Sequence, residues 1–285
     1  MTDRRSLWSN GEVAHVSLRG QVDAARFVEG EVHRITAPLA DLCAAPRGAR
    51  DRQLLLGEAF HVLDLQEGWC FGAALRDGYV GWVDAALFAP KQAEPTHVVI
   101  ASTSYVKTTP GLKAMGEVKP VSFGSQVSVF STSDGWAEVD WGQGTLPRTR
   151  YMPLPHLAPL DYLATNPVSV AERLLGTPYL WGGNSSFGID CSGLVQAALL
   201  ACGLPCPGDS DQQETTLGTT LPANTPAQRG DLFFWKGHVA MAVDNKTIIH
   251  ANAHHMAVSL ECLQDAINRI HAQGDGPVTS HKRLD

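Results

Sequence analysis

The chain has 285 residues, of which 44% are hydrophobic and 18% charged, with 27 glycines and 17 prolines. This composition is typical of a turn-rich globular protein of two or three domains and argues against extensive disorder. The net charge of −7 offers no basic surface, so we expect neither nucleic acid nor a membrane as a partner. The first residues lack the apolar core of a secretory leader, which favours a cytoplasmic protein. A secreted or periplasmic protein remains the alternative if a leader has been trimmed.

The cysteine content does not indicate a disulfide scaffold. Six cysteines in 285 residues is a low density, so we expect free thiols. Histidines 250, 254 and 255 lie near Cys262, but the paired spacing of a zinc site is missing. We therefore expect neither a metal nor another cofactor.

The first half of the chain is predicted to form two small all-β domains. After an N-terminal polar extension (1–30), residues 31–92 and 93–157 alternate short runs rich in Val, Leu and Phe with Gly, Pro and Asp turn signals. This spacing is typical of a small barrel or sandwich. Three residues recur 67 positions apart, which indicates a duplication: Gly57 and Gly124, Gly68 and Gly135, Trp69 and Trp136.

The pattern changes near residue 158. PVSVAERLLGTP is predicted to be a helix closed by Gly176 and Pro178, and CSGLVQAALLACGLP a second helix. The runs DLFFW, HVAMAV and TIIHANA that follow are strand-like. Helices followed by an antiparallel sheet predict an α+β domain over residues 158–285.

Cys191 is the strongest candidate for a nucleophile. It opens the second predicted helix, where unpaired backbone N–H groups and the helix dipole favour a thiolate. Its own N–H could also bind the carbonyl oxygen under attack. The alternative is a buried structural cysteine.

His238 and His250 are candidates for the base and its orienting partner. Side chains alternate along strands, so the two histidines share a face only if the turn between them keeps even parity. A three-residue turn, Asp244-Asn245-Lys246, places His250 opposite Ala240 and diagonal to His238. A two-residue turn places them on opposite faces. Ordinary strand or loop histidines remain the alternative.

Five motifs in order, PYLWGG, DCSGLV, RGDLFFW, GHVAM and IIHA, resemble the NlpC family of papain-like cell-wall cysteine peptidases. The duplicated segments resemble bacterial SH3-like domains. The resemblance implies an α+β fold, with a papain-like C-terminal peptidase domain preceded by two SH3-like barrels. It also implies a catalytic triad of Cys191, His238 and His250. Tyr179 is expected beside the active site, where it could help to hold the oxyanion.

SH3-like domains ahead of such a peptidase are similar to the γ-D-glutamyl-L-diamino-acid endopeptidases. These cut the bond between γ-D-Glu and the diamino acid in stem peptides with a free N-terminal L-Ala, during murein peptide recycling. Acceptors for that ammonium are expected at Asp190 and Ser192, which flank the nucleophile, and at Ser210. The resemblance adds Glu58 and Tyr79 of the first SH3-like domain.

Two other functions remain open at this point: a secreted hydrolase acting on intact peptidoglycan, and a non-catalytic wall-binding module. The sequence does not specify the diamino acid, the oligomeric state or the role of the second SH3-like domain.

Overall fold

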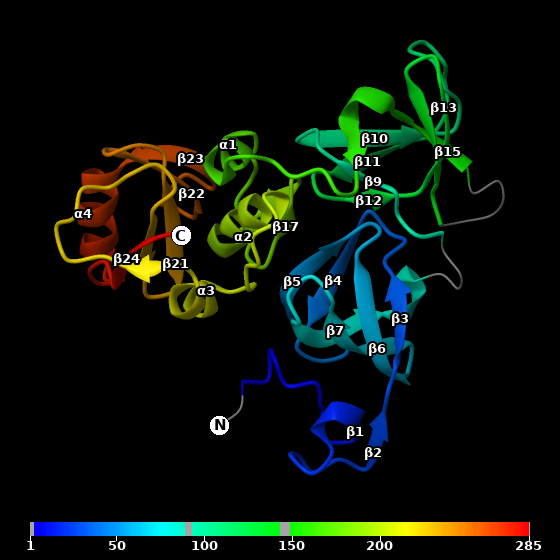
Figure 1. Cartoon of the computed structure of the whole chain (residues 1–285), viewed down its shortest axis with the longest axis horizontal. Helices are drawn as coiled ribbons and strands as arrows, with labels where there is room; N and C mark the ends of the chain where they lie inside the picture. Colours follow the sequence, from blue (N-terminus) through cyan, green and yellow to red (C-terminus); the bar gives the residue numbers. More distant parts are fainter. Residues whose placement is uncertain (1–2, 89–92, 143–148, 285) are drawn as a thin grey trace. The chain divides into compact units, whose positions relative to one another are not determined.

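The computed structural model describes residues 3–88, 93–142 and 149–284 (Figure 1). The chain divides into two compact units, Met1–Tyr162 and Leu163–Asp285. The first is built almost entirely from strands, and the second combines helices with an antiparallel sheet. The α+β class predicted from the sequence is therefore confirmed. No helix in the described part of the chain is long and apolar enough to cross a membrane.

The first β domain is a six-stranded sheet in the order β3-β6-β7-β8-β4-β5. Alternating apolar residues of these strands point into one core, which includes the fully buried Ile35, Leu42, Leu54, Phe60 and Val83. The short 3₁₀ helix η2 (Ala85–Leu87) follows the last strand. The strands are β3 (Glu31–Arg34), β4 (Leu39–Cys43), β5 (Arg50–Leu55), β6 (Ala59–Gln66), β7 (Trp69–Ala74) and β8 (Val80–Asp84).

The second β domain repeats this order with one strand broken in two. Its sheets run β11-β10-β15-β14-β13 and β12-β9-β16, so β12 and β13 together take the place of β6. The strands are β9 (His97–Val99), β10 (Thr103–Lys107), β11 (Val118–Ser122), β12 (Gln126–Val127), β13 (Val129–Ser133), β14 (Trp136–Asp140), β15 (Thr149–Pro153) and β16 (Leu157–Pro159). A 3₁₀ helix, η3 (Leu154–His156), follows β15 as η2 follows β8. Strand β16 pairs with β9, so the chain near residue 158 is still part of this domain.

Backbone angles support the predicted duplication. Gly57 and Gly124 have φ of 80° and 82°, and Gly68 and Gly135 have 83° and 79°. These values lie in the left-handed region that glycine adopts without a steric penalty. The repeated tryptophans also open equivalent strands, β7 and β14. The two domains therefore turn at the same places.

The sheet of the first β domain is open rather than a closed barrel, which differs from the barrel predicted by the sequence. Its two edges are β3 and β5. Beyond β5, Gly57 N–H donates to Ile35 O (2.8 Å) and Ile35 N–H donates to Glu58 O (3.0 Å). Among the described residues, only these two backbone hydrogen bonds connect the end of β3 with the end of β5, because the chain turns at Gly57 and the two edge strands do not pair along their length.

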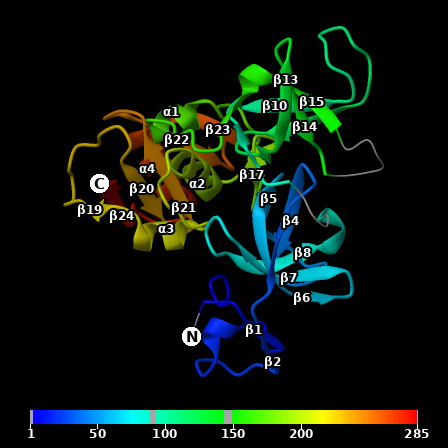
Figure 2. The same cartoon turned by 45° about the vertical axis from the view of Figure 1, so that its right-hand side comes forward.

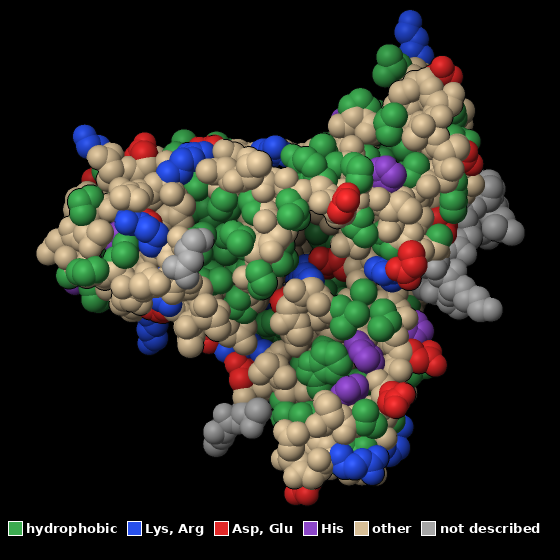
Figure 3. All heavy atoms as spheres, viewed as in Figure 1, with side chains coloured by type: hydrophobic (Ala, Val, Ile, Leu, Met, Phe, Trp, Pro, Cys, Tyr) green, Lys and Arg blue, Asp and Glu red, His purple; other side chains and the backbone are tan. Residues whose placement is uncertain are grey.

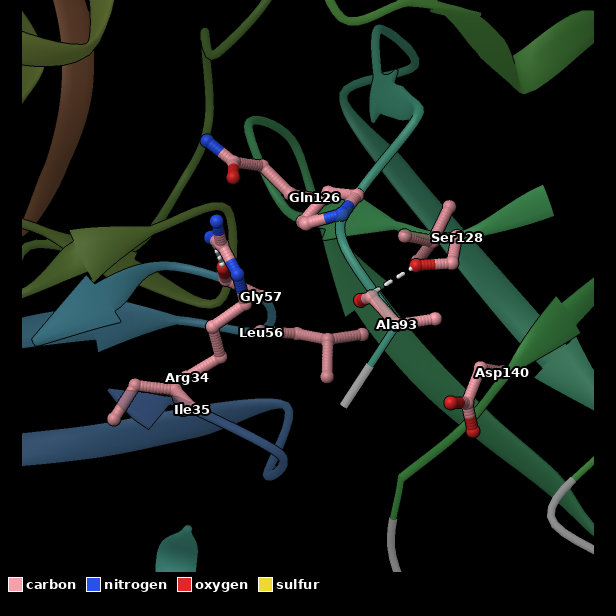
Figure 4. Close-up of a pocket in the computed structure, with 10 residues that line it drawn as sticks. Arg34, Ile35, Leu56, Gly57, Ala93, Gln126, Ser128 and Asp140 are labelled. Atoms are coloured by element: carbon pink, nitrogen blue, oxygen red, sulfur yellow. Dashed lines mark hydrogen bonds between the residues drawn. The ribbon is translucent and has the colours of Figure 1, made fainter. Parts of the chain in front are cut away.

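The two β domains meet around Gly57. A Cβ added there would lie 2.2 Å from Gln126 O, so only glycine allows this approach. Figure 4 shows the hollow beside it, where Arg34 donates to Gly57 O (3.0 Å) and Ser128 Oγ donates to Ala93 O (2.9 Å). Arg34 also forms an ion pair with Glu94. The cavity volume of about 20 Å³ has room for about one water molecule. Residues of both β domains line this cavity, which is too small for a ligand.

The N-terminal extension is folded onto the first β domain (Figure 2). It forms β1 (Val13–His15), η1 (Val16–Leu18) and β2 (Arg26–Val28), with β1 and β2 parallel. Val13 is fully buried in a cluster with Leu63, Phe71, Ala73, Val80 and Trp82. The extension is therefore not merely polar, because its few apolar residues complete an outer core.

Aromatic contacts reinforce this packing. Trp8 meets His15 and His61 edge to face, with ring centroids 5.2 Å apart in both pairs. Figure 3 shows histidines gathered in its lower part, and it shows acidic and basic side chains interspersed over the visible face. That mixture of charges offers no extended basic surface on this face.

The C-terminal unit is centred on a six-stranded antiparallel sheet in the order β19-β24-β20-β21-β22-β23. Its strands are β19 (Thr219–Thr220), β20 (Leu232–Trp235), β21 (His238–Ala242), β22 (Thr247–Asn252), β23 (Ala257–Cys262) and β24 (Ser280–Arg283). A small hairpin, β17 (Asn184–Ser185) and β18 (Gly188–Ile189), precedes the sheet in the chain.

Four helices accompany this sheet, and in Figure 1 its strands stand between α4 and α2. Helix α2 packs against β21 and β22, and α4 packs on the sheet through Ala266 and Ile270. The helices are α1 (Pro167–Glu172), α2 (Cys191–Ala201), α3 (Ser210–Thr216) and α4 (Leu263–Gln273).

Candidate active site

Cys191 is the first residue of α2, and Asp190 caps the helix. The Asp190 carboxylate accepts hydrogen bonds from Gly193 N–H (2.6 Å), Ser192 Oγ (3.1 Å) and Gly182 N–H (2.9 Å). A carboxylate at this position satisfies otherwise unpaired N–H groups and suits the helix dipole. It also ties the preceding glycine loop to the start of the helix, so the position of Cys191 is fixed from both sides.

These contacts bear on the expected ammonium acceptors. Asp190 and Ser192 are buried, with exposed fractions of 7% and 5%. Three donors of the chain hold the Asp190 carboxylate, so it helps to position the start of α2. Its oxygens can still accept a further hydrogen bond, so Asp190 also stays a candidate for ammonium binding. Ser210 is the half-buried first residue of α3 and stays available as a candidate.

Gln213 ties α3 to α2, a connection that sequence reasoning missed. Its amide Nε2 donates to Ser192 O (2.9 Å) and Pro207 O (2.9 Å), and the side chain is fully buried. The signal available was a glutamine one helical turn after Asp209, which is weak. The bonds hold the residue after the nucleophile from a second element.

His238 and His250 contact each other, as the three-residue turn predicted. Strand β21 pairs with β22 through Met241 opposite Ile249 and Ala242 opposite Ile248, the register that places Ala240 opposite His250. Nε2 of His238 lies 2.9 Å from Nδ1 of His250. The rings are part of one hydrogen-bonded pair on adjacent strands.

Removal from water keeps both rings neutral, since His250 is fully buried and His238 is partly buried. Desolvation lowers the pKa of His238 to about 3, with the charges of His250 and Arg269 acting in the same direction. Desolvation likewise lowers the pKa of His250 to about 4, although Glu261 opposes the shift. At neutral pH, His238 therefore carries the uncharged imidazole that a general base requires.

Tyr179 lies close to the cysteine. The residue forms an isolated bridge with Ile189, two positions before Cys191. Burial raises the pKa of its phenol well above the usual value, and negative charge on Cys191 and Asp190 adds to the shift. The phenol is therefore protonated and able to donate a hydrogen bond at neutral pH.

Glu261 and Arg269 extend the histidine pair, and the sequence had not singled them out. Nε2 of His250 lies 2.9 Å from Glu261 Oε2, and Arg269 Nη2 lies 2.6 Å from the same oxygen. The alternation in VSLEC could have indicated that Glu261 shares a sheet face with Ser259, the residue paired with His250. Nothing comparable links Arg269 to the site.

Glu58 and Tyr79 lie in the first β domain, and both are largely buried. The Glu58 carboxylate accepts from Leu55 N–H (2.9 Å), and both of its oxygens accept from Arg76 Nη1 (2.9 Å). Tyr79 is 5% exposed and belongs to the core of that domain. Glu58 is therefore not an ordinary surface carboxylate, since its side chain is largely buried and its charge is paired with Arg76.

Comparison with known proteins identifies two segments. Residues 176–272 match the NlpC/P60 family, and residues 42–86 match the bacterial dipeptidyl-peptidase SH3 domain. The chain is 27% identical over 235 residues to a gamma-D-glutamyl-L-lysine dipeptidyl-peptidase of Bacillus cereus, which covers 70% of this chain and 67% of that protein. It is 36% identical over 102 residues to dipeptidyl-peptidase 6 of Lysinibacillus sphaericus, covering 35% and 36%. The chain thus spans about a third of this second relative.

The fold matches a solved structure over most of its length. A crystal structure of an NlpC/P60 family protein from Bacillus cereus superposes with a TM-score of 0.73, covering 89% of this chain and 99% of that chain, at 20% identity. At that identity the likeness establishes the fold, including both the SH3-like and the papain-like parts. It does not assign a substrate.

Proposed function

Residues 176–272 are an NlpC/P60 domain and residues 42–86 a bacterial dipeptidyl-peptidase SH3 domain, and on that basis we propose that this cysteine peptidase cuts the bond between γ-D-Glu and the diamino acid of cell-wall stem peptides. The observation that carries the proposal is the similarity to a gamma-D-glutamyl-L-lysine dipeptidyl-peptidase over 235 residues. That stretch is too long to lie within the peptidase domain alone. The proposed substrate has a free N-terminal L-Ala and arises during murein peptide recycling.

Cys191 is the proposed nucleophile and His238 its base. The thiol proton passes to His238, and the sulfur attacks the γ-carbonyl carbon of D-Glu to form a thioester. His238 then gives the proton to the amine of the leaving diamino acid. Water hydrolyses the thioester with His238 again acting as base, which regenerates the thiol. His250 is proposed to orient the base, a role supported by the 2.9 Å contact between the two rings.

Two donors are proposed to stabilise the oxyanion that forms during each attack. One is the backbone N–H of Cys191, which lies in the first turn of α2, where N–H groups point out of the start of the helix. The other is the Tyr179 phenol, whose raised pKa keeps its proton in place. A donor preset for the developing charge typically contributes about 10²–10³ in kcat.

The free amine of the substrate needs acceptors. We propose Asp190, Ser192, Ser210, Glu58 and Tyr79 for this role, with Asp190 and Ser192 also holding the nucleophile in place. A paired carboxylate such as Glu58 still has lone pairs to offer an ammonium, because each of its oxygens can accept more than one hydrogen bond. A recycling role further predicts a cytoplasmic enzyme, which cell fractionation tests.

The deciding experiment is mass spectrometry of the products from free L-Ala-γ-D-Glu-meso-diaminopimelate and from the corresponding L-Lys peptide. Release of L-Ala-γ-D-Glu from either peptide is the expected result, and the faster substrate identifies the diamino acid. Intact peptidoglycan serves as the competing substrate. Cleavage of the intact polymer at an equal rate would replace this proposal with a wall-directed hydrolase.

A further inference from the structure

A buried chain of polar contacts continues behind His250, away from His238. Glu261 on β23 lies 2.9 Å from His250 Nε2 through its Oε2 atom. Arg269 on α4 donates two hydrogen bonds to this carboxylate, from Nε to Oε1 (2.9 Å) and from Nη2 to Oε2 (2.6 Å). The Glu261 and Arg269 side chains are only 11% and 18% exposed. The contacts therefore form one series from His238 through His250 and Glu261 to Arg269.

The carboxylate fixes where the protons are. Burial alone would raise the pKa of Glu261, but its hydrogen bonds with Arg269 and His250 and the positive charge of Arg269 hold it below its usual value. Glu261 is thus ionised and can only accept, so His250 Nε2 must carry the hydrogen. In a neutral ring this leaves Nδ1 of His250 bare, and that atom accepts from Nε2–H of His238.

The same logic determines the free nitrogen of the base. With its hydrogen on Nε2, a neutral His238 has a bare Nδ1, and Nδ1 is the nitrogen not engaged by His250. Only this tautomer can take a proton from a thiol without first losing one. The order of hydrogen bonds thus presets His238 as an acceptor.

Arg269 protects that arrangement. If His250 were charged, its Nδ1–H would donate to a bare Nε2 of His238, and the single hydrogen of His238 would then occupy Nδ1. His238 could no longer accept the thiol proton. Ionised Glu261 favours a charged His250, whereas Arg269 and His255 oppose it. The charged and titratable groups acting on His250 are thus His238, Glu261, Arg269 and His255, from β21, β23, α4 and the turn before β23.

We propose that Glu261 and Arg269 are positioning residues that set the tautomer of His250 and, through it, that of the base His238. Glu261 holds the hydrogen of His250 on Nε2, and Arg269 prevents the carboxylate from charging the ring. The inference rests on the proposed pairing of Cys191 with His238. It does not depend on which peptide is cleaved.

Three variants test this pair of roles: Glu261→Gln, Arg269→Met and the double variant. Glu261→Gln offers His250 either an acceptor or a donor, so we expect a mixture of tautomers. By analogy with the groups that orient metal-binding histidines, we expect kcat to fall by roughly tenfold to a hundredfold. KM should stay unchanged. Arg269→Met should raise the pKa of His250, so that the acid limb of the kcat profile moves to higher pH. The double variant should lack this shift because the carboxylate that causes it is gone.

Arg229→Met is the matched control. Arg229 also pairs with a glutamate of the C-terminal unit, Glu172 (2.9 Å), and its other hydrogen bonds go to Val243 O and Ser169 Oγ rather than to a histidine. This change should leave the pH profile in place. Thermal unfolding of every variant shows whether it is folded at the temperature of the assay. Histidine NMR spectra are compared only between folded proteins.

Imidazole ¹⁵N NMR without substrate provides the decisive readout. In the unmodified protein both rings should be neutral with hydrogen on Nε2 at pH 7. A His250 protonated on Nδ1, or identical tautomers and pH profiles in all three variants, would overturn the proposal. Correct tautomers in an enzyme that fails to release L-Ala-γ-D-Glu would contradict the proposed function alone.

Discussion

His238 on β21 and His250 on the adjacent strand β22 lie diagonally opposite each other, and Nε2 of His238 is 2.9 Å from Nδ1 of His250. The register of β21 and β22 produces this contact, since Met241 lies opposite Ile249. A shift by one residue would turn every side chain of β22 to the other face. The spacing of the two histidines in the sequence is therefore as important as their identity.

The contact predicts unequal effects of removing each ring. His238→Ala deletes the group that moves the proton, whereas His250→Ala deletes only the partner that orients it. Water or repacking can replace an orienting group in part. We expect His250→Ala to retain the higher kcat/KM of the two, measured on the free tripeptide. The reverse order would mean that the two roles have been exchanged.

Cys191→Ala should abolish peptidase activity and leave the fold intact. No other residue can supply the sulfur, and loss of a nucleophile reaches about 10⁶ in kcat in the subtilisin triad. The side chain is small and the helix cap does not involve it, so circular dichroism and the unfolding temperature should change little. Turnover by the purified variant would refute the assignment of the nucleophile.

Iodoacetamide should modify Cys191 before the other five cysteines at neutral pH. None of the six cysteines, all of which lie in the described part of the chain, forms a disulfide. Burial raises the pKa of Cys70 to about 11 and also raises that of Cys43 and Cys202, so these thiols should react slowly. Cys262 is the informative control because it is exposed. Peptide mapping that finds Cys262 labelled as fast as Cys191 would contradict an activated thiol.

The lowered pKa values of His238 and His250 predict acid sensitivity. Their unfolded-state pKa is about 6.5, while the folded values are about 3 and about 4. Below pH 6.5 the two histidines are protonated in the unfolded chain but stay neutral in the native state. The free energy of unfolding therefore falls as the pH falls toward 4. Urea unfolding from pH 7 to 4.5 measures this. The slope should be smaller in His250→Gln, and an unchanged slope would show that the ring is not buried neutral.

The sequence was enough to propose catalytic residues, but it did not indicate the side chains that hold them in place. Cys191, His238 and His250 belong to local motifs whose strand and helix positions follow from periodicity. Arg269 reaches its partner from a helix packed on the sheet, a tertiary contact that periodicity does not encode. The pairing of Glu58 with Arg76 was missed for the same reason, as was the burial of Val13 in a mostly polar segment. The duplication was visible because turns require glycine at fixed places.

The paired state of Glu58 changes what its removal should do. The Glu58 and Arg76 side chains are each 12% exposed, and Nη1 of Arg76 lies 2.9 Å from the carboxylate. Neutralising Glu58 removes the nearer of two carboxylates that pair with Arg76, because Asp77 stays 3.5 Å from its Nε. The loss of stability should thus be smaller than the value of about 3–5 kcal/mol that is typical when a buried charge is left unpaired. The structure therefore predicts a lower free energy of unfolding for Glu58→Gln.

Glu58→Gln should nevertheless reveal the amine site, provided that folded enzyme is compared with folded enzyme. We expect kcat/KM on the free tripeptide to fall at least about tenfold, since truncating one partner of a desolvated charge pair costs about 2–5 kcal/mol. Acetylating the substrate amine should harm the unmodified enzyme similarly but add little to the variant, because both changes remove the same interaction. Arg76→Met is the matched control: it breaks the same ion pair and lowers stability, yet keeps the carboxylate, so discrimination between free and acetylated amine should persist. If Arg76→Met loses that discrimination as Glu58→Gln does, or if the unmodified enzyme cleaves the acetylated peptide as fast as the free one, Glu58 does not bind the ammonium.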